Sequence, residues 1–253
     1  MSFAFGDVEA NFARAAEWIA EAAARGADLV LLPELWASGY DLPNWPRYAA
    51  ALDDEEGAFG RVAALARQHG IAVGGSLLEA RHGKAYNTFA LFGPQGERWG
   101  VYRKVHLFCL LEEEKWLAAG DELVLAETPW GAVGMAICYD LRFPELCRHY
   151  AVASARLILI PAEWPATRVA HWSALLKGRA IENQCYVAGV NKVGESQSVR
   201  LGGHSAVVDP WGETLVEGDF EEALLTVEID LREAEKARRF IPVFRDRRPE
   251  LYG

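Results

Sequence analysis

The alternation of short apolar runs with amphipathic patterns is the feature that most limits what this chain can fold into. Runs such as Leu29–Leu32, Ala132–Ile137 and Leu157–Ile160 carry no charge, which is typical of strands buried on both faces. Between them, apolar residues recur every three or four positions, the period of a helix with one buried face. Helices that alternate with such strands predict sheets covered by helices, an α/β architecture with two sheets.

The pattern places the individual elements along the chain. Helices are expected near Phe12–Ala23, Glu55–Gln68, Pro144–Ala153 and Thr167–Glu182. Strands are expected at Leu29–Leu32, Ile71–Leu78, Ala85–Phe92, Arg98–Tyr102, Ala132–Ile137, Leu157–Ile160 and Tyr186–Asn191, and the tail Ser205–Asp230 should be β around a turn at Asp209–Gly212. No repeat, low-complexity segment or linker divides the chain, so residues 1–253 are predicted to form a single domain.

Composition and charge exclude several classes of protein. Hydrophobic residues make up 51% and charged residues 25% of the chain, as in folded globular proteins. The net charge of −10 argues against nucleic acid as a partner. The apolar runs are too short for a membrane-spanning helix, and Met1–Asp7 lacks the pattern of a signal peptide. A cytoplasmic protein without a membrane partner is therefore expected.

The four cysteines are expected to be free thiols. Cys109, Cys138, Cys147 and Cys185 form no Cys-x-x-Cys pair and no zinc-type spacing with histidine. A free cysteine in a reducing compartment is either a small buried hydrophobe or a nucleophile. No metal and no organic cofactor is required by the sequence.

Four groups that could take part in catalysis follow the predicted strands. Glu34, Lys104, Cys138 and the pair Glu163-Trp164 each come after an apolar run. Ligands of α/β proteins collect outside the carboxyl ends of strands, so these groups are candidates for one site. Taken singly, each has an ordinary structural explanation, such as a capping acid, a solvated amine or a packed thiol.

Together these groups suit acyl transfer. An ammonium such as Lys104 would lower the pKa of the Cys138 thiol and stabilise an oxyanion, with the backbone N–H of Tyr139 as a second donor. A partly buried carboxylate whose pKa is raised toward neutrality could take the thiol proton, pass it to the leaving nitrogen and then activate water. Glu34 could be that base.

At these residues the sequence resembles the nitrilase superfamily of carbon-nitrogen hydrolases. The motifs that carry the resemblance are Leu31–Trp36 (LLPELW), Tyr102–Phe108 (YRKVHLF) and Gly134–Glu145 (GMAICYDLRFPE). Similarity extends from Gly6 toward the end of the chain, through Arg179–Asn183, Gly203–Ser205, Val208–Gly212 and Arg245–Pro249. The resemblance implies a four-layer α-β-β-α sandwich, a homodimer, and a triad of Glu34 as base, Lys104 as oxyanion stabiliser and Cys138 as nucleophile.

The resemblance also implies a second glutamate between the lysine and the cysteine. Glu112, Glu113 and Glu114 are all available, and Glu113 is chosen because its spacing from Lys104 and Gly120 resembles that of the amidase branch. A solvated run of charges is the alternative. Asp140, Arg142 and Glu145 are expected to brace the loop after Cys138, and the other three cysteines are expected to pack.

Within the superfamily the chain looks most like the omega-amidases, which hydrolyse the terminal amide of 2-oxo dicarboxylic acid monoamides such as 2-oxoglutaramate and release ammonia. Tyr139, Glu163, Trp164 and Arg168 are the expected substrate-binding residues, and Arg168 or Lys177 could bind the substrate carboxylate. Glu163 stands where an asparagine is expected, and its carboxylate could repel an anionic substrate.

Other functions remain open. The same triad could hydrolyse deaminated glutathione or an N-carbamoyl amino acid, and a silent binding or scaffolding protein is the non-enzyme alternative. No Gly-x-Ser-x-Gly, Walker A or Gly-x-Gly-x-x-Gly motif is present, which disfavours a serine hydrolase or nucleotide binding.

The start of the chain departs from the family pattern. Family members have an apolar first strand ahead of the segment that matches Phe5–Asp7, and Met1–Phe5 leaves little room for it. A shortened first strand, or a sheet edge with unpaired backbone groups, is therefore expected.

Overall fold

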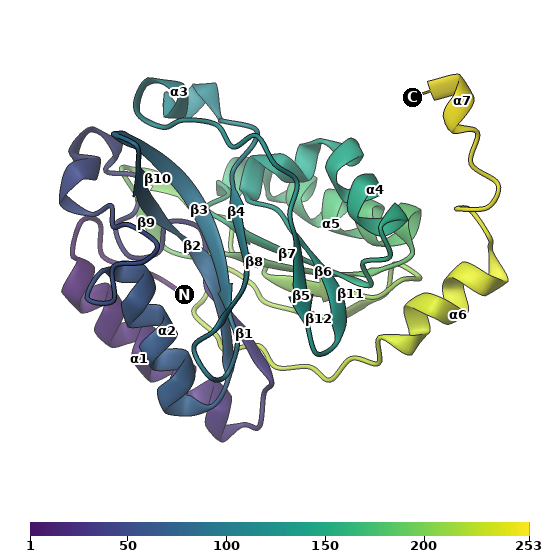
Figure 1. The fold of residues 1–253 in the computed structure, drawn as a ribbon, viewed down its shortest axis with the longest axis horizontal. Helices are drawn as coiled ribbons and strands as arrows, with labels where there is room; N and C mark the ends of the chain where they lie inside the picture. Colours follow the sequence, from purple (N-terminus) through teal and green to yellow (C-terminus); the bar gives the residue numbers. More distant parts are fainter. Residues whose placement is uncertain (253) are drawn as a thin grey trace.

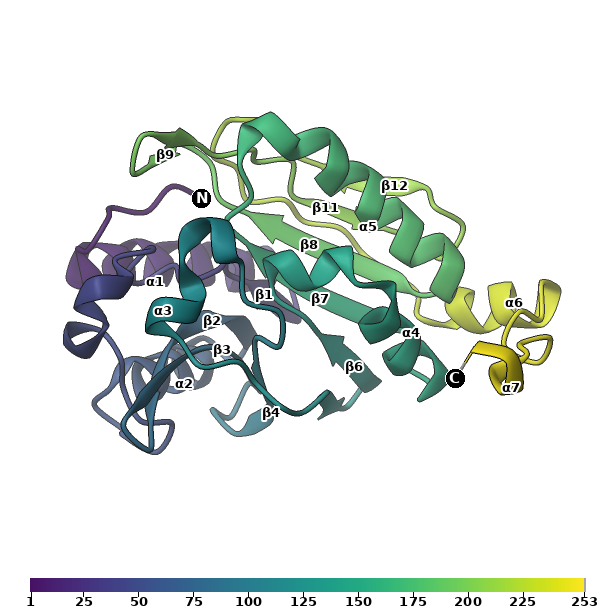
Figure 2. The same ribbon diagram turned by 90° about the horizontal axis from the view of Figure 1, so that it is seen from above.

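Two β-sheets lie face to face at the centre of the molecule, and helices cover the outer face of each (Figures 1 and 2). The structure is a computed structural model that describes residues 1–252. Its layers are helix, sheet, sheet and helix, as the resemblance implied. Among the described residues no helix has the length and apolarity needed to cross a membrane.

The first sheet has four strands in chain order. They are β1 (Leu29–Leu31), β2 (Ala72–Arg81), β3 (Lys84–Phe92) and β4 (Arg98–Arg103). β1 is parallel to β2, whereas β2–β3 and β3–β4 are antiparallel. Helices α1 (Val8–Ala24) and α2 (Ala58–His69) cover this sheet and present Phe12, Ile19, Phe59 and Val62 to it. The side chain of Asp7 accepts from the backbone N–H of Ala10 and so caps the start of α1.

The second sheet has six strands in the order β12-β11-β8-β7-β6-β5. They are β5 (Leu125–Thr128), β6 (Gly131–Met135), β7 (Leu157–Ala162), β8 (Tyr186–Asn191), β11 (Ala206–Val208) and β12 (Thr214–Glu217). The central strands β6, β7 and β8 are parallel, so their carboxyl ends meet at one edge. Helices α4 (Pro144–Val152) and α5 (Val169–Asn183) cover the outer face.

Apolar side chains of both sheets interlock between the layers. Phe89, Leu91 and Tyr102 of the first sheet share one core cluster with Val133 and Met135 of the second. The close approach of the two sheets also requires a residue without a side chain on β4. A Cβ atom at Gly100 would lie 2.7 Å from Ala126 Cβ and 2.7 Å from Met135 Sδ.

Most predicted elements are observed, but the sequence did not predict β5, the short helix Glu113–Trp116 or the short strands Glu195–Ser196 and Val199–Arg200. Strand β8 has the predicted bounds, and the hairpin of β11 and β12 turns at Asp209–Gly212. The prediction of β structure up to Asp230 was wrong, because β12 ends at Glu217 and residues 218–230 form no strand. Helix α6 (Arg232–Phe240) was missed because it is short and most of its residues are charged. Residues 1–6 form no strand.

A large groove lies beside β1. It has a volume of about 730 Å³ and is lined by β1, by Leu157, Leu159 and Val207 of the second sheet, and by residues 223–229. Met1 also lines the groove, and its backbone C=O accepts from the N–H of Val193. Among residues 1–252 the strand paired with β1 is β2, so the other edge of β1 faces this groove without a strand partner there.

Filling this groove should stabilise the fold. Six alternating Val and Ile residues added ahead of Met1 are expected to pair with the free edge of β1 and to raise the melting temperature by about 5 °C or more. Thermal unfolding followed by circular dichroism is the measurement. A Gly-Ser extension of the same length is the control, and equal melting temperatures for the two versions would contradict the prediction.

Candidate active site

Four chain segments meet at the carboxyl ends of the strands. Glu34 follows β1, Lys104 follows β4, Cys138 follows β6 and Glu163 follows β7. The two sheets face each other there, so groups that are distant in the sequence surround one place in the fold. The structure therefore brings together the acid, the amine and the thiol that the sequence singled out.

Glu34 is fully buried, and polar groups surround its carboxylate. Its Oε1 accepts from Lys104 Nζ at 2.8 Å and from Asn87 Nδ2 at 2.8 Å. Its Oε2 accepts from the backbone N–H of Glu163 at 2.9 Å. Leu35 adopts a left-handed backbone with φ of 43°, and its N–H donates to Ser76 Oγ, which fixes the turn that presents Glu34.

Lys104 lies between two buried carboxylates. Its Nζ is 2.8 Å from Glu34 Oε1 and 2.7 Å from Glu113 Oε1, and the side chains of all three residues are inaccessible to solvent. Glu113 also accepts from Tyr40 Oη at 2.8 Å and from the Phe108 N–H at 2.8 Å.

Of the three consecutive glutamates only Glu113 points inward. Glu112 and Glu114 are exposed. A left-handed turn at Glu112 starts the short helix α3 (Glu113–Trp116) and directs Glu113 to Lys104.

Cys138 sits at a sharp turn. Its φ of 47° is unusual for a residue with a side chain, and it starts the 3-10 helix η3 (Cys138–Arg142) shortly after β6 ends at Met135. Asp140 holds the turn, since its carboxylate accepts from the N–H groups of Ile137 and His106 and from Tyr102 Oη. Asp140 thus braces the loop, as the sequence predicted.

The pKa shifts of Glu34 and Cys138 differ from those expected from the sequence. Burial raises the pKa of Glu34, but the charge and hydrogen bond of Lys104 outweigh it, so this pKa is lowered rather than raised toward neutrality. Burial and the Glu34 charge raise the pKa of the Cys138 thiol, and Lys104 offsets this only in part. The pKa of the thiol was expected to be lowered, and that expectation was wrong because burial and the Glu34 charge outweigh the effect of Lys104.

Glu113 is the carboxyl group whose pKa is raised. Burial is the largest cause and the charge of Glu34 adds to it, whereas Lys104 acts in the opposite direction. Burial lowers the pKa of Lys104, but the charges of Glu113 and Glu34 raise it by more than burial lowers it. The ammonium therefore remains charged. The resting site therefore pairs a protonated thiol with an ionised Glu34, and the two groups are close enough for each to shift the pKa of the other.

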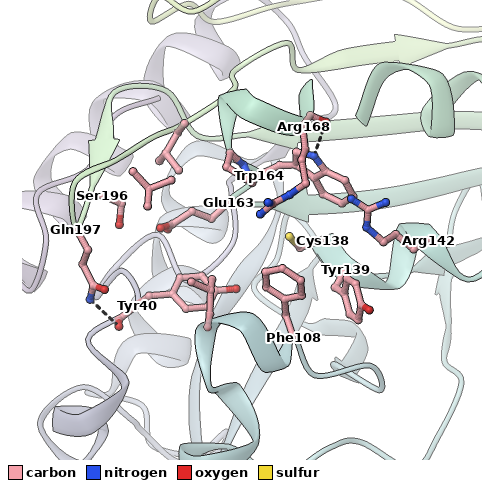
Figure 3. Close-up of a pocket in the computed structure, with 14 residues that line it drawn as sticks. Tyr40, Phe108, Cys138, Tyr139, Arg142, Glu163, Trp164, Arg168, Ser196 and Gln197 are labelled. Atoms are coloured by element: carbon pink, nitrogen blue, oxygen red, sulfur yellow. Dashed lines mark hydrogen bonds between the residues drawn. The ribbon is translucent and has the colours of Figure 1, made fainter. Parts of the chain in front are cut away.

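Cys138 opens into a small pocket of about 130 Å³ (Figure 3). Figure 3 shows its sulfur pointing into this space, with the ring of Phe108 on one side and Trp164 and Arg168 on the other. The strands β9 (Glu195–Ser196) and β10 (Val199–Arg200) form a ribbon that closes the far side. The complete lining consists of Tyr40, Phe108, Leu111, Cys138, Tyr139, Arg142, Glu163, Trp164, Pro165, Arg168, Ser196, Gln197, Val199 and Leu201.

All four predicted substrate-binding residues line this pocket, and Lys177 does not. Tyr139, Glu163, Trp164 and Arg168 are part of its wall. Lys177 is exposed on α5, so its assignment as a partner for the substrate carboxylate was wrong, because it lies on a face of the helix that is open to solvent.

Two further expectations need correction. Arg142, expected only to brace the loop, lines the pocket and stacks on the Trp164 ring at 4.6 Å. Cys147 and Cys185 are buried as expected, whereas Cys109 is exposed and does not pack.

The sequence alone did not single out several residues that support the site. Tyr40 and Asn87 contact the buried acids, and Lys192 contacts Glu163 at 2.5 Å. Asn87 lies within a strand and Tyr40 in a loop, where no periodic signal marks them. Lys192 directly follows β8, so the rule that groups after parallel strands meet at one edge could have found it.

Comparisons with known proteins agree on one family. A model of the carbon-nitrogen hydrolase family matches residues 4–239. The chain is 41% identical to 2-oxoglutaramate amidase from Bacillus subtilis over 94% of this chain and 91% of the relative. It is 39% identical to omega-amidase from Homo sapiens over 96% of this chain and 91% of the relative.

Solved structures give the same result. A carbon-nitrogen hydrolase superfamily protein from Xanthomonas campestris, with an arsenic adduct in its active site, superimposes with a TM-score of 0.90 at 31% identity, over 98% of this chain and 94% of that one. A mutant of an amidase from Nesterenkonia, with acrylamide added to its active-site cysteine, has a TM-score of 0.87 at 27% identity, over 99% and 95% of the two chains.

The Lys104 ammonium should be essential for the stability of this buried cluster. Lys104→Met leaves Glu34 and Glu113 buried without a cation, which is expected to lower the free energy of unfolding by about 3–5 kcal/mol near neutral pH. Urea unfolding is the measurement, with Lys177→Met on the surface as the control.

The penalty should also depend on pH. In the wild type the lowered pKa of Glu34 gives a contribution to stability that is present above the ordinary carboxyl pKa and lost as the pH falls through the folded value. In the variant, burial without a cation raises that pKa, so the neutral acid is tolerated at about pH 5 and the destabilisation grows toward about pH 8. An equal penalty at both pH values would contradict this account.

Proposed function

Because the chain belongs to the carbon-nitrogen hydrolase family, it is an amidase, and we propose that it hydrolyses the terminal amide of a small carboxylate-bearing substrate such as 2-oxoglutaramate. The observation that carries the proposal is the cluster of Cys138, Glu34 and Lys104 at the base of a pocket that is lined by two arginines. Both relatives described above carry names of amidases of this type.

Acylation begins with the thiol of Cys138 in this proposal. The sulfur attacks the amide carbon while its proton passes to the ionised Glu34, whose lowered pKa keeps it ready to accept. The Lys104 ammonium and the N–H of Tyr139 stabilise the oxyanion that forms. The carbon–nitrogen bond then breaks, and Glu34 returns the proton to the leaving nitrogen, which departs as ammonia.

Hydrolysis of the thioester completes the cycle. Glu34 takes a proton from water, the resulting hydroxide attacks the thioester carbon, and the sulfur leaves and recovers its proton from Glu34. The product is a carboxylic acid. Glu113 holds Lys104 from the other side throughout, since its Oε1 is 2.7 Å from the ammonium and Tyr40 and the Phe108 N–H fix its carboxylate.

The substrate's remote carboxylate is proposed to meet Arg168, with Trp164 and Tyr139 as the walls beside it. Arg168 lies over the ring of Phe108 at 5.8 Å, and its backbone C=O accepts from Trp164 Nε1, which fixes the base of its side chain. A guanidinium suits a planar carboxylate because it can donate two parallel hydrogen bonds. The pocket volume of about 130 Å³ favours a short substrate.

A homodimer and a cytoplasmic location complete the proposal. Ile181, Trp211, Phe240 and Ile241 are exposed. Trp211 and Phe240 contact each other, and Ile181 lies against Gly212, so these residues form one apolar surface that a second copy would cover. A reducing compartment keeps Cys138 as the thiol that the reaction needs.

Replacing the nucleophile should abolish turnover. Cys138→Ala is expected to lower ammonia release from 2-oxoglutaramate by about 10⁴-fold or more while the protein stays folded, because no other group can form the thioester. A coupled glutamate dehydrogenase assay measures the ammonia, and circular dichroism checks the fold. Cys109→Ala, at the exposed thiol, is the matched control, and undiminished turnover in Cys138→Ala would reject the mechanism.

A further inference from the structure

The pocket wall contains three charged side chains, and one of them has the wrong sign for an anionic substrate. Arg142, Glu163 and Arg168 all line the pocket. A free carboxylate at Glu163 would oppose the two guanidinium groups and repel a substrate carboxylate. The charge state of this wall therefore decides which amides the pocket accepts.

Lys192 pairs with that carboxylate from behind the wall. Its Nζ lies 2.5 Å from Glu163 Oε2, and the side chains of Lys192 and Glu163 are only 5% and 6% exposed. Lys192 itself does not line the pocket. Its ammonium also lies 3.4 Å from the backbone oxygen of Leu35, in the turn next to Glu34. Because the pair is buried, water screens it little.

The pairing of Lys192 with Glu163 leaves the two arginines of the pocket wall free to face a substrate carboxylate. Arg142 stacks on Trp164 and has an NH2 group 3.4 Å from His171 Nδ1, and Arg168 lies over Phe108. Within residues 1–252 neither guanidinium forms an ion pair. With Glu163 neutralised by Lys192, the pocket wall keeps a positive balance.

We propose that Lys192 is a specificity-determining residue, which neutralises Glu163 and so makes the pocket selective for amides that carry a carboxylate. The inference rests on the proposed function and extends it from the reaction to the choice of substrate. It also explains how a carboxylate at position 163 is compatible with an anionic substrate. Lys192 acts through Glu163 and does not touch the substrate.

The test compares substrates of different charge in matched variants. The kcat/KM values are measured for 2-oxoglutaramate, for the anionic amide succinamate and for the neutral amide butyramide. Lys192→Met is expected to lower the ratio of anionic to neutral turnover by about ten- to thirtyfold, the size of one like-charge interaction at intermediate dielectric. The double variant Glu163→Gln with Lys192→Met should recover most of that ratio.

Controls separate charge from positioning. Lys192→Arg keeps the positive charge and should keep the ratio, and Lys177→Met on the surface should leave all three substrates unchanged. The inference is overturned if Lys192→Met lowers kcat/KM equally for the anionic and the neutral amides. It is also overturned if the double variant does not restore the ratio of anionic to neutral kcat/KM. Should Lys192→Met fail to fold, Glu163→Gln alone decides, because removing the anion must raise the ratio and an unchanged ratio would reject the proposal.

The proposed function and this inference can fail separately. A wild-type protein that turns over succinamate but not 2-oxoglutaramate rejects the proposed substrate, and the charge selectivity is still read from succinamate against butyramide. A wild-type protein that prefers butyramide to both anions rejects the inference.

Discussion

The Lys104 ammonium, held between two buried carboxylates, is the interaction on which the rest of the site depends. Three charges in a region without solvent would be unfavourable if any one of them lacked a partner. Here Glu34 and Glu113 each contact the same nitrogen through Oε1, and Asn87 and Tyr40 donate to these same oxygens. The two Oε2 atoms accept from the backbone N–H groups of Glu163 and Phe108. The cluster joins the first sheet to the loops around it, and the nucleophile of the second sheet completes it.

This electrostatic arrangement explains why the thiol needs a base. A cysteine beside an ammonium in a wet site would be expected to ionise by itself. Burial and the negative charge of Glu34 instead raise the pKa of Cys138, so the thiol stays protonated until Glu34 can take its proton. Lys104 lowers the pKa of Glu34 and so keeps the base ionised. In the proposed mechanism the same ammonium then stabilises the oxyanion. Lys104 thus both keeps the base ionised and stabilises the intermediate.

Backbone turns position these groups as much as the strands do. Leu35, Glu112 and Cys138 all have positive φ values, which residues with side chains seldom adopt. Each follows or precedes a residue of the cluster or belongs to it. Hydrogen bonds from the Leu35 N–H to Ser76 Oγ and from the Ile137 N–H to Asp140 hold two of these turns. Such turns occur elsewhere in the chain too, but at these three positions they direct a functional side chain inward.

Much of the fold followed from local signals in the sequence. Periodicity predicted the central strands and their covering helices because an apolar run such as Leu157–Ala162 can satisfy its backbone and its side chains only inside a sheet. The signal failed for the short charged helix α6 and for residues 218–230, which form no strand. Strand pairing is a long-range interaction, so composition cannot reveal that a partner is missing.

The sequence by itself determined the chemical groups of the site, because Glu34, Lys104 and Cys138 each follow a recognisable strand and lie within long motifs. The resemblance favoured Glu113 in the run 112–114, and the tertiary structure places that residue against Lys104. Only the tertiary structure decided that Arg142 lines the pocket and that Lys192 pairs with Glu163. It also reversed the expected directions of the pKa shifts of Glu34 and Cys138. The reason is physical: residue types are local, whereas burial and the distances between charges exist only after distant segments have packed together.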